Sequence, residues 1–472
     1  MAQSATLTRN DAGIETAISI LKQRFADRLQ TGAAIREQHG HTTTWIANQS
    51  PDAVVFPQST EDVSDIVKVC AAHHVPVIAF GTGTSLEGHV NAPAGGISVD
   101  LTGMNRVLAV HTEDLDCVVQ PGVTRAELNT HLRDQGLFFP IDPGANASLG
   151  GMAATRASGT NAVRYGTMRD NVLSLEAVMP DGRIIRTGNR ARKSSAGYDL
   201  ARLLIGAEGT LGIITELTLR LHGIPEAITS ARCSFPTVDA ACQAVMMTIQ
   251  YGIPVARIEL LDTLSVKAAN AYSGLNLPDT PLLLLEFHGS DASVREQAET
   301  FGQIAGEFGG TDFAATSTTE ERNKLWQARH DMYWACLQLR PGADGISTDV
   351  CVPISRLAEA VVTAQDKADE LGLAAPIVGH VGDGNFHTLL LIDMENADEI
   401  SKADEFVGWL NDLAISMDGT CTGEHGIGQG KRPYLIKELG AATDYMAAIK
   451  SALDPNNIMN PGKILPDQNP LR

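Results

Sequence analysis

Two short motifs in the C-terminal half carry residue types that bind metals and move protons. They are His380-Val-Gly-Asp-Gly-Asn-Phe-His387 and Cys421-Thr-Gly-Glu-His-Gly-Ile-Gly428. The two histidines flank a Gly-Asp-Gly turn between two predicted strands, and a hairpin folds such ends toward each other. With Glu424 they form a set of two histidines and one carboxylate, which suits a divalent metal with open coordination positions. The alternative is that both histidines are hydrogen-bonded residues of the interior.

The open positions indicate a substrate that chelates the metal. A 2-hydroxy acid does so through its carboxylate and hydroxyl, and His425 is then the candidate base that takes the hydroxyl proton while the C2 hydrogen leaves as hydride. The alternatives for His425 are a metal ligand or a hydrogen-bond partner of one. Arg329, Arg340 and Lys431 are candidate cations for the substrate carboxylate, because arginine binds carboxylates bidentately. The alternative for each is a solvated surface side chain.

Two glycine-rich segments further upstream suit an anionic dinucleotide. Gly81-Thr-Gly-Thr-Ser-Leu-Glu-Gly88 follows a predicted strand, and its N–H groups and hydroxyls suit a pyrophosphate. It is not a Rossmann fingerprint, because the third glycine is missing at the required spacing and no helix pattern begins there. Nearly every side chain of Pro143–Gly166 is small, so its backbone can approach a ligand closely. The alternatives are an ordinary turn and a flexible linker.

Composition limits the class of protein. The chain has 472 residues, which suits two or three domains, and its net charge of −20 disfavours nucleic acid and anionic membranes as broad partners. No apolar run is long enough for a transmembrane helix, and the N-terminus is not a secretory signal. The seven cysteines are scattered without a Cys-x-x-Cys pair, which favours a reducing compartment over a disulfide framework or an iron–sulfur cluster.

Hydrophobic periodicity divides the chain near Pro225. In the first region it predicts strands at 53–56, 75–80, 97–101, 107–110, 116–120, 173–179, 183–187 and 213–221, and helices at 11–31, 59–74, 124–135 and 203–205. In the second region it predicts strands at 229–235, 255–261, 281–289, 347–352, 377–381 and 385–392, and helices at 238–251, 292–307, 319–339 and 354–371. This second pattern favours an antiparallel sheet with helices on one face. The tail contains one predicted helix at 441–453.

Several longer motifs resemble one family. They are Gly81-Thr-Gly-Thr-Ser-Leu-Glu-Gly, Pro143-Gly-Ala-Asn, Gly150-Gly-Met, Ala157-Ser-Gly, Val163-Arg-Tyr-Gly-Thr, Arg192-Lys-Ser-Ser-Ala-Gly-Tyr-Asp-Leu, Gly206-Ala-Glu-Gly-Thr-Leu-Gly-Ile, Leu325-Trp-Gln-Ala-Arg-His, Ser347-Thr-Asp-Val-Cys-Val-Pro-Ile-Ser, Gly379-His-Val-Gly-Asp-Gly-Asn-Phe-His and Gly423-Glu-His-Gly-Ile-Gly. From about residue 50 to Leu465 the chain resembles the FAD-linked oxidases and dehydrogenases of the vanillyl-alcohol oxidase type. Within them it is similar to cytochrome-type D-lactate dehydrogenases and to glycolate oxidase flavin subunits.

The resemblance implies an α+β fold. Its parts are an N-terminal helical segment (1–48), a two-subdomain FAD-binding domain of the PCMH type (49–225), a ferredoxin-like substrate or cap domain (226–420) and a C-terminal segment that returns to the flavin (421–472). Some relatives attach FAD covalently through a histidine before the first glycine loop. Phe80 stands there in this chain, so we expect non-covalent FAD.

The resemblance also implies roles for single residues. His380, His387 and Glu424 would hold a divalent metal (Zn or Mn), His425 would be the base, and Arg329 and Asn385 would contact the substrate; Arg340 remains a further candidate. The residues implied to bind FAD are Gly81, Thr82, Gly83, Thr84, Ser85, Leu86, Gly88, Pro143, Gly144, Gly150, Gly151, Ala154, Ser158, Gly159, Val163, Glu208, Gly212, Ile213 and Asn460.

The activity that the resemblance implies is FAD-dependent oxidation of D-lactate, or a similar small D-2-hydroxy acid, to the 2-oxo acid. Electrons would pass to a quinone, a cytochrome or an electron-transfer flavoprotein. Ser347 and Thr348 stand where 2-hydroxyglutarate dehydrogenases can place a lysine, which disfavours a second substrate carboxylate. We expect a cytoplasmic protein, with peripheral attachment at the inner membrane and a homodimer as options. The alternatives are a glycolate oxidase subunit, a D-2-hydroxyglutarate dehydrogenase, and a flavin- or metal-binding protein without turnover.

Overall fold

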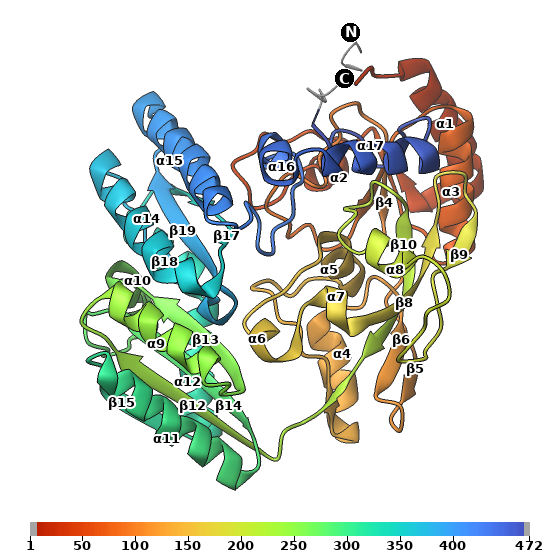
Figure 1. Ribbon diagram of the computed structural model, residues 1–472. Coiled ribbons are helices and arrows are strands. Elements are labelled where there is room, and N and C mark those ends of the chain that lie inside the picture. The colour runs from red at the N-terminus through yellow and green to blue at the C-terminus, as the bar shows by residue number, and fades with distance from the viewer. Residues whose placement is uncertain (1–6, 467–472) are drawn as a thin grey trace. The chain divides into compact units, whose positions relative to one another are not determined.

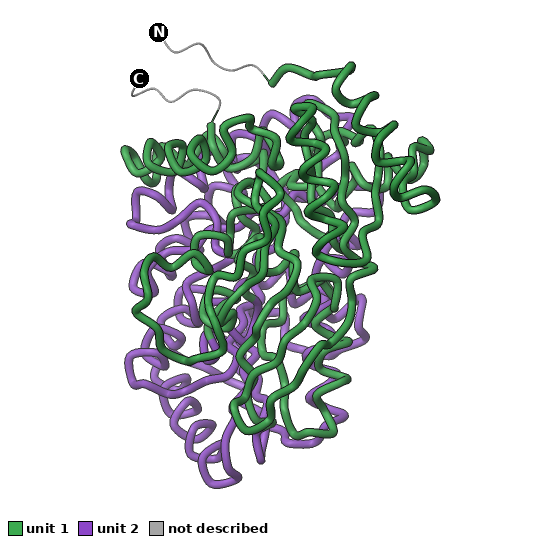
Figure 2. Tube along the Cα trace, turned by 90° about the vertical axis from the view of Figure 1, so that its right-hand side faces the viewer, with its two compact units in different colours: residues 1–158, 166–224, 424–472 green, residues 159–165, 225–423 purple. Residues whose placement is uncertain are grey.

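The computed structural model describes residues 7–466. The outermost parts of the expected terminal segments, 1–6 and 467–472, lie outside these residues. The chain forms two compact units (Figure 2). Unit 1 contains the chain up to Ser158, Gly166–Ile224 and the chain from Glu424 onward, and unit 2 contains Gly159–Tyr165 and Pro225–Gly423. The chain therefore passes between the units at four peptide bonds.

Unit 1 contains two main sheets (Figure 1). The first has the order β1-β2-β4-β3, with β2 and β3 both parallel to β4, and packs on α1 and α3. The second is antiparallel with the order β5-β6-β10-β8-β9 and packs on α4 and α5. The first sheet and its helices are β1 (Leu29–Gln30), β2 (Ala53–Val55), β3 (Val77–Phe80), β4 (Ile97–Asp100), α1 (Asp11–Phe25), α2 (Ala33–Gln38) and α3 (Thr60–Ala72). The remaining elements of unit 1 are β5 (Val107–His111), β6 (Asp116–Val119), β7 (Leu137–Phe138), β8 (Val172–Val178), β9 (Ile184–Arg186), β10 (Ile213–Arg220), β11 (His222–Gly223), α4 (Arg125–Leu132), α5 (Leu149–Thr155), α7 (Met168–Asn171), α8 (Leu200–Leu204), α16 (Arg432–Leu439) and α17 (Ala442–Leu453).

The C-terminal segment completes the first sheet. The Val77 N–H donates to the Ile458 carbonyl at 2.7 Å, and the Asn460 N–H donates to the Val77 carbonyl at 2.9 Å. Ile458 and Met459 are buried in the same hydrophobic cluster as α1 and α3. The segment thus pairs with the free edge of β3, whose C-terminal end leads directly into the glycine loop that begins at Gly81.

Unit 2 is built on one antiparallel sheet with the order β15-β12-β14-β13-β18-β19-β16, and β17 also pairs with β19. Its strands are β12 (Ala227–Ser234), β13 (Val255–Leu261), β14 (Leu282–Gly289), β15 (Thr311–Thr316), β16 (Asp344–Ser347), β17 (Val350–Cys351), β18 (Ile377–Gly379) and β19 (Asn385–Ile392). Its helices are α6 (Ala162–Tyr165), α9 (Val238–Gln250), α10 (Thr263–Ser273), α11 (Asp291–Glu307), α12 (Thr319–His330), α13 (Met332–Leu337), α14 (Leu357–Leu371) and α15 (Ala397–Ser416).

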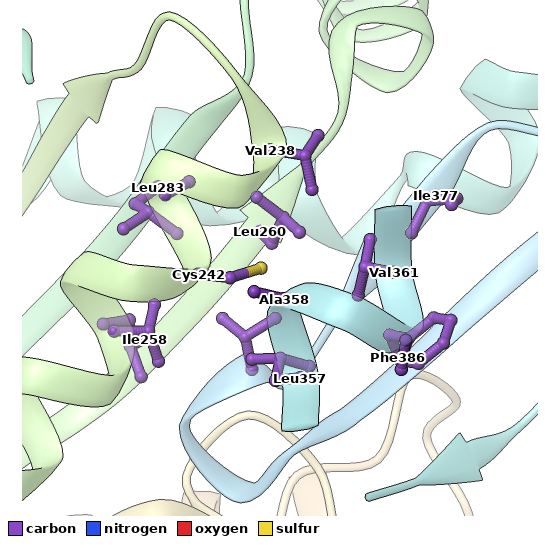
Figure 3. Packing of buried hydrophobic residues seen from close by; sticks show 14 of the residues in the cluster. Val238, Cys242, Ile258, Leu260, Leu283, Leu357, Ala358, Val361, Ile377 and Phe386 are labelled. Carbon is purple, nitrogen blue, oxygen red and sulfur yellow. The ribbon is translucent and has the colours of Figure 1, made fainter. Parts of the chain in front are cut away.

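Both faces of this sheet are covered, so the expectation of helices on one face is wrong. Leu260 belongs to the large cluster with α9, α11, α14 and α15 (Figure 3), whereas its neighbour Leu261 belongs to a second cluster with α10, α12 and α13. Successive residues of a strand point to opposite faces, so the two clusters lie on opposite sides of the sheet. The apolar run in β14 is explained in the same way, because Leu283 and Leu284 fall in different clusters.

Other differences from the sequence-based expectations are local. The predicted helix at 319–339 is interrupted at Asp331, between α12 and α13, and the predicted strand at 347–352 is divided into β16 and β17. The predicted helix at 11–31 ends at Phe25. Elements α10, α15, α16 and β15 were not expected. Among residues 7–466, no helix combines the length and the apolarity that crossing a membrane requires.

Candidate active site

His380 and His387 lie on one hairpin of unit 2. His380 directly follows β18, His387 is in β19, and the turn between them ends at Gly384 with φ +80°. The two strands are antiparallel with Val378 opposite His387. The imidazole centroids are 5.4 Å apart with the rings nearly perpendicular, and both residues are buried. The fold therefore brings the two predicted metal ligands together.

Hydrogen bonds at Nδ1 define which nitrogen each histidine offers to a metal. His387 Nδ1 lies 2.9 Å from the Thr348 carbonyl oxygen, and His380 Nδ1 lies 2.8 Å from Glu259 Oε1. A carbonyl or an ionised carboxylate only accepts, so each Nδ1 carries the hydrogen. The lone pair of each ring is then on Nε2, which is the arrangement of a metal-ligating histidine whose other nitrogen is anchored.

Asn385 and Asp349 form the polar floor beside this hairpin. Asn385 Nδ2 donates to Asp349 Oδ1 and to the Val350 carbonyl, both at 2.8 Å. Its Oδ1 is buried without a hydrogen-bond partner among the described residues, which leaves an acceptor for a ligand. Asp349 also accepts from Thr422 Oγ1 at 2.9 Å and so anchors the start of the Gly423-Glu-His motif.

Gly423 is packed tightly against this floor. A Cβ at this position would overlap Asn385 Nδ2 and lie 3.0 Å from Asp349 Oδ1. Glu424 is joined to it by a peptide bond, so the Glu424 Cα is about 3.8 Å from that of Gly423. Within unit 1, Ser158 Oγ donates to Glu424 Oε2 at 3.0 Å.

Arg329, on α12, forms an ion pair with Glu259 of β13. Its Nε and Nη2 lie 2.8 and 2.7 Å from Glu259 Oε2. Burial alone would raise the pKa of Glu259, but its interactions with His380 and Arg329, which include a hydrogen bond from each, outweigh burial and hold that pKa below its usual value. The Glu259 carboxylate thus links Arg329 to His380, which is a predicted metal ligand. Glu259 was not predicted as a functional residue; the only sequence signal was a single acid within the apolar strand Val-Ala-Arg-Ile-Glu-Leu-Leu.

Arg340 has a different partner. Its Nη1 and Nη2 contact Glu399 at 2.6 and 2.9 Å, and Nη1 also donates to the Leu391 carbonyl at 3.0 Å. This bidentate pair raises the pKa of Arg340 and lowers that of Glu399 to about 2. The substrate role expected for Arg340 stays a prediction, with its guanidinium bound to Glu399 and the Leu391 carbonyl. Lys431 is buried in unit 1, with its Nζ 3.6 Å from Glu87 Oε1.

The two glycine-rich segments meet within unit 1. A Cβ on Gly81 would overlap Ser148 Oγ, so the first loop passes directly beside the start of α5. No helix follows the first loop, as expected, and Gly83 adopts φ +66°. Ser85 Oγ is buried without a hydrogen-bond partner among the described residues. Small side chains on two adjacent backbones and an unused hydroxyl fit a dinucleotide.

The predicted FAD residues have varied surroundings. Thr82, Thr84 and Gly144 are exposed, and Leu86, Pro143, Gly151, Ala154 and Ser158 are partly exposed. Gly88, Gly150, Gly212 and Ile213 are buried in unit 1, and Gly159 and Val163 belong to unit 2, where Val163 packs on the main core.

Glu208 and Asn460 shape the loop that carries His425. Glu208 accepts hydrogen bonds from the Ile427 and Gly428 N–H groups at 2.7 and 2.8 Å. Asn460 donates to the Glu208 carbonyl at 2.7 Å and to the His89 carbonyl at 3.1 Å, while its Oδ1 is buried with no hydrogen-bond partner among residues 7–466. His425 Nδ1 lies 3.8 Å from Glu87 Oε1. The carboxylate of Glu208 thus binds backbone of unit 1, which is a structural contact that the sequence did not indicate.

Comparisons with known proteins define the class. Residues 51–188 match the model of the FAD binding domain, and residues 224–464 match that of the C-terminal domain of FAD linked oxidases. The chain therefore belongs to the FAD-linked oxidase family, as the motifs indicated. The α+β fold class with a PCMH-type FAD-binding domain is likewise confirmed.

Two relatives and one solved structure are similar over nearly the whole chain. A protein of Danio rerio named probable mitochondrial D-lactate dehydrogenase is 50% identical and covers 98% of this chain and 94% of its own length. Mitochondrial D-lactate dehydrogenase [cytochrome] of Arabidopsis thaliana is 48% identical over 95% of this chain and 80% of its own. The 4-ethylphenol oxidase of Gulosibacter chungangensis, at 18% identity, superposes with a TM-score of 0.80 over 98% of this chain and 99% of that one. The last likeness concerns the fold alone.

Proposed function

We propose that the chain is an FAD- and divalent-metal-dependent dehydrogenase that oxidises D-lactate, or a similar small D-2-hydroxy acid, to the 2-oxo acid. The observation that carries this proposal is the hairpin of His380 and His387, whose rings both offer Nε2, in a chain of the FAD-linked oxidase family. The names of its relatives supply the substrate, D-lactate.

We propose His380, His387 and Glu424 as the metal ligands. Two imidazoles and a carboxylate leave open positions and suit Zn²⁺ or Mn²⁺. When bound, FAD accepts a hydride and the metal ion polarises a substrate oxygen. The position of Glu424 directly after Gly423, which packs on Asn385, is consistent with this set.

The chain's own residues orient the substrate and move its proton. Arg329 binds the substrate carboxylate through the N–H groups that Glu259 does not use, and Asn385 Oδ1 accepts a hydrogen bond from the substrate. His425 takes the hydroxyl proton, and the nearby Glu87 carboxylate favours the imidazolium that results. The Thr348 hydroxyl accepts from the Thr388 N–H at 2.9 Å, and the Thr348 carbonyl anchors His387. Thr348 therefore offers no cation for a second substrate carboxylate.

The remaining expectations also stay proposals. The electron acceptor is a quinone, a cytochrome or an electron-transfer flavoprotein, and the relative from Arabidopsis thaliana is named for cytochrome. Non-covalent FAD is proposed because Phe80 precedes the first glycine loop. A cytoplasmic site is proposed from the scattered cysteines, with peripheral attachment at the inner membrane and a homodimer as options. The two relatives are themselves named as mitochondrial.

An anaerobic stopped-flow experiment tests the proposal. D-Lactate should bleach the flavin of the purified protein, and L-lactate should not. Glycolate and D-2-hydroxyglutarate in the same screen distinguish the two enzyme alternatives, and metal analysis of the same sample identifies the ion. A yellow protein that no hydroxy acid reduces would favour a binding protein without turnover and would refute the proposed reaction.

A further inference from the structure

Glu259 connects two groups of the proposed site. It lies within β13, and none of its side chain is exposed to solvent. Its Oε1 is 2.8 Å from His380 Nδ1, and its Oε2 is 2.8 and 2.7 Å from Arg329 Nε and Nη2. We propose that Glu259 is a positioning residue that fixes the metal-binding nitrogen of His380 and aims Arg329 at the substrate carboxylate. This inference rests on the proposed function.

The chemistry of a carboxylate explains why this position requires an acid. Each of its two oxygens accepts, so one fixes the hydrogen of His380 on Nδ1 while the other receives the guanidinium. A buried carboxylate also needs a compensating charge, and Arg329 supplies it. An amide of the same shape has one accepting oxygen and one donating nitrogen. It therefore satisfies only one partner, and the donor end faces either the Nδ1 hydrogen of His380 or the Arg329 N–H groups.

The orientation of Arg329 follows from the same contact. Glu259 receives one N–H of Nε and one of Nη2, out of the five N–H groups of the guanidinium. The outer edge, with the Nη1 hydrogens and the second hydrogen of Nη2, retains the parallel pair that binds a carboxylate bidentately. With its side chain only 11% exposed, Arg329 has little freedom to change this direction. Glu259 therefore sets the direction in which Arg329 presents its charge.

The neighbouring strand offers a matched control. Glu286 in β14 is also buried, and it accepts from Ser230 Oγ at 3.0 Å and contacts His288 Nε2 at 2.9 Å. Arg257 lies opposite it in the register and contacts it at 3.6 Å. Because Glu259 pairs with Leu284, two residues before Glu286, the two acids share one face of the sheet. Glu286→Gln removes an equivalent charge next to a histidine and an arginine that are not proposed to bind metal or substrate.

The test measures metal affinity directly. Full-length protein with bound FAD is titrated with Mn²⁺ or Zn²⁺ against a chelator of known affinity, for the wild type, Glu259→Gln and Glu286→Gln. Loss of a hydrogen-bond partner of a ligating histidine weakens metal binding by roughly 10- to 100-fold. We expect this loss for Glu259→Gln, together with a changed Mn²⁺ EPR spectrum and a raised KM for D-lactate. The metal affinity of Glu286→Gln should stay within about twofold of the wild-type affinity, because the surroundings of the proposed metal ligands are unchanged.

Separate outcomes overturn the inference and the proposed function. If the wild type binds the metal and Glu259→Gln binds it equally well, Glu259 has no positioning role, although the proposed reaction stands. The proposed metal site fails if the wild type binds no metal, or if His387→Ala does not abolish the metal binding that the wild type shows. The inference then fails with it. An equal loss of metal affinity in Glu259→Gln and Glu286→Gln would also overturn the inference, because a general loosening of the sheet would then explain both.

A second variant covers failure of Glu259→Gln to fold. Glu259→Asp keeps the charge that Arg329 requires but withdraws the carboxylate by one methylene from both donors. Its FAD content and circular dichroism should match those of the wild type. Its metal affinity should fall by at least about threefold, which is less than the loss expected for Glu259→Gln, where the hydrogen-bond partner is removed. Wild-type metal affinity in Glu259→Asp would contradict a positioning role that depends on this geometry.

Discussion

At the scale of single residues, His425 is the group on which the proposed chemistry depends most directly. His425→Ala should slow anaerobic flavin reduction by D-lactate by roughly 10²- to 10⁴-fold, which is the usual contribution of a general base. FAD should stay bound, since the loop is held through Glu208 and the backbone of Ile427 and Gly428. Stopped-flow absorbance measures the rate. His131→Ala, an exposed change on α4, is the control, and equal rates in the two variants would remove His425 from the reaction.

The candidate site could be predicted only in part from its residues. The histidine pair and Glu424-His425 stand out because their spacing and Gly-rich surroundings are local features of the sequence. Glu259 could not be predicted, because its importance comes from β18 pairing with β13 and from α12 covering the sheet. Arg340 was a candidate because it ends a helical segment, but its partner Glu399 is on α15, an element that the sequence analysis did not identify.

Lys463 should make stability depend on pH. Burial lowers its pKa to about 7, against the opposing charge of Glu208, and its Nζ donates to the Asn91 carbonyl at 2.7 Å. An unfolded lysine titrates near 10.4, so between about pH 7 and 10.4 the unfolded chain holds one more proton than the folded chain. The free energy of unfolding therefore rises with pH in this window, by up to about 1.4 kcal/mol per pH unit from this group.

Urea unfolding at pH 7, 8 and 9 measures this slope. In Lys463→Met the contribution is absent, so the stability of the variant should rise less with pH than that of the wild type. Lys324→Met, a change of an exposed lysine on α12, serves as the control and should keep the wild-type slope. Identical slopes for the wild type and Lys463→Met would show that Lys463 does not titrate in this window.

At the scale of elements, the hairpin between β18 and β19 depends on Gly384. Its φ is +80°, and a Cβ there would overlap the Val352 carbonyl oxygen. Gly372, after α14, has φ +68° but open space around the same position. Gly372→Ala should therefore cost about 1–2 kcal/mol, for the left-handed backbone conformation alone. Gly384→Ala should cost about 1–3 kcal/mol more because of the overlap, and it should weaken metal binding by displacing the two histidines.

Denaturant unfolding and metal titration of both variants check this prediction. Equal destabilisation by the two changes would mean that the hairpin tolerates a side chain at Gly384.

The hairpin itself could be predicted, since Gly-Asp-Gly separates two β-type runs. Helix α15 also carried a signal, because Ala403, Phe406, Leu410 and Ala414 recur at helical spacing and are all buried, but the charged residues between them obscured it. The break at Asp331 has no such local signal, because it reflects packing of α12 and α13 on the sheet.

At the scale of the whole molecule, segment 159–165 is the clearest case of a local sequence that serves a distant unit. Tyr165 O–H lies 2.7 Å from His288 Nδ1, whose other nitrogen contacts Glu286, and Asn161 accepts from Arg257 at 3.0 Å. These contacts bind the segment to the sheet of unit 2, although the chain on both sides of it belongs to unit 1. Sequence patterns could not reveal this, because the segment is short and continuous with the small-residue stretch of the FAD-binding domain.

Tyr165→Phe tests how firmly this segment is held. The change leaves the buried His288 Nδ1 without its donor, which should cost about 1–3 kcal/mol. Amide hydrogen exchange in residues 159–165 should accelerate, while exchange in the core strands of unit 2 stays slow. Tyr198→Phe, at a side chain that is 95% exposed, should change neither quantity. Unchanged exchange in 159–165 would mean that the tyrosine contact does not restrain the segment.

The return of the C-terminal segment to β3 has a consequence for synthesis on the ribosome. Ile458 and Met459 join the core of unit 1, and Val77 pairs with them, only after the whole of 225–423 has been translated. At about 5–20 residues per second, that interval is on the order of tens of seconds. During this time the edge of β3 and its apolar neighbours have no strand from the tail to cover them. Newborn chains are therefore most exposed to aggregation before the last segment emerges, and a premature stop codon within it would extend that exposure indefinitely.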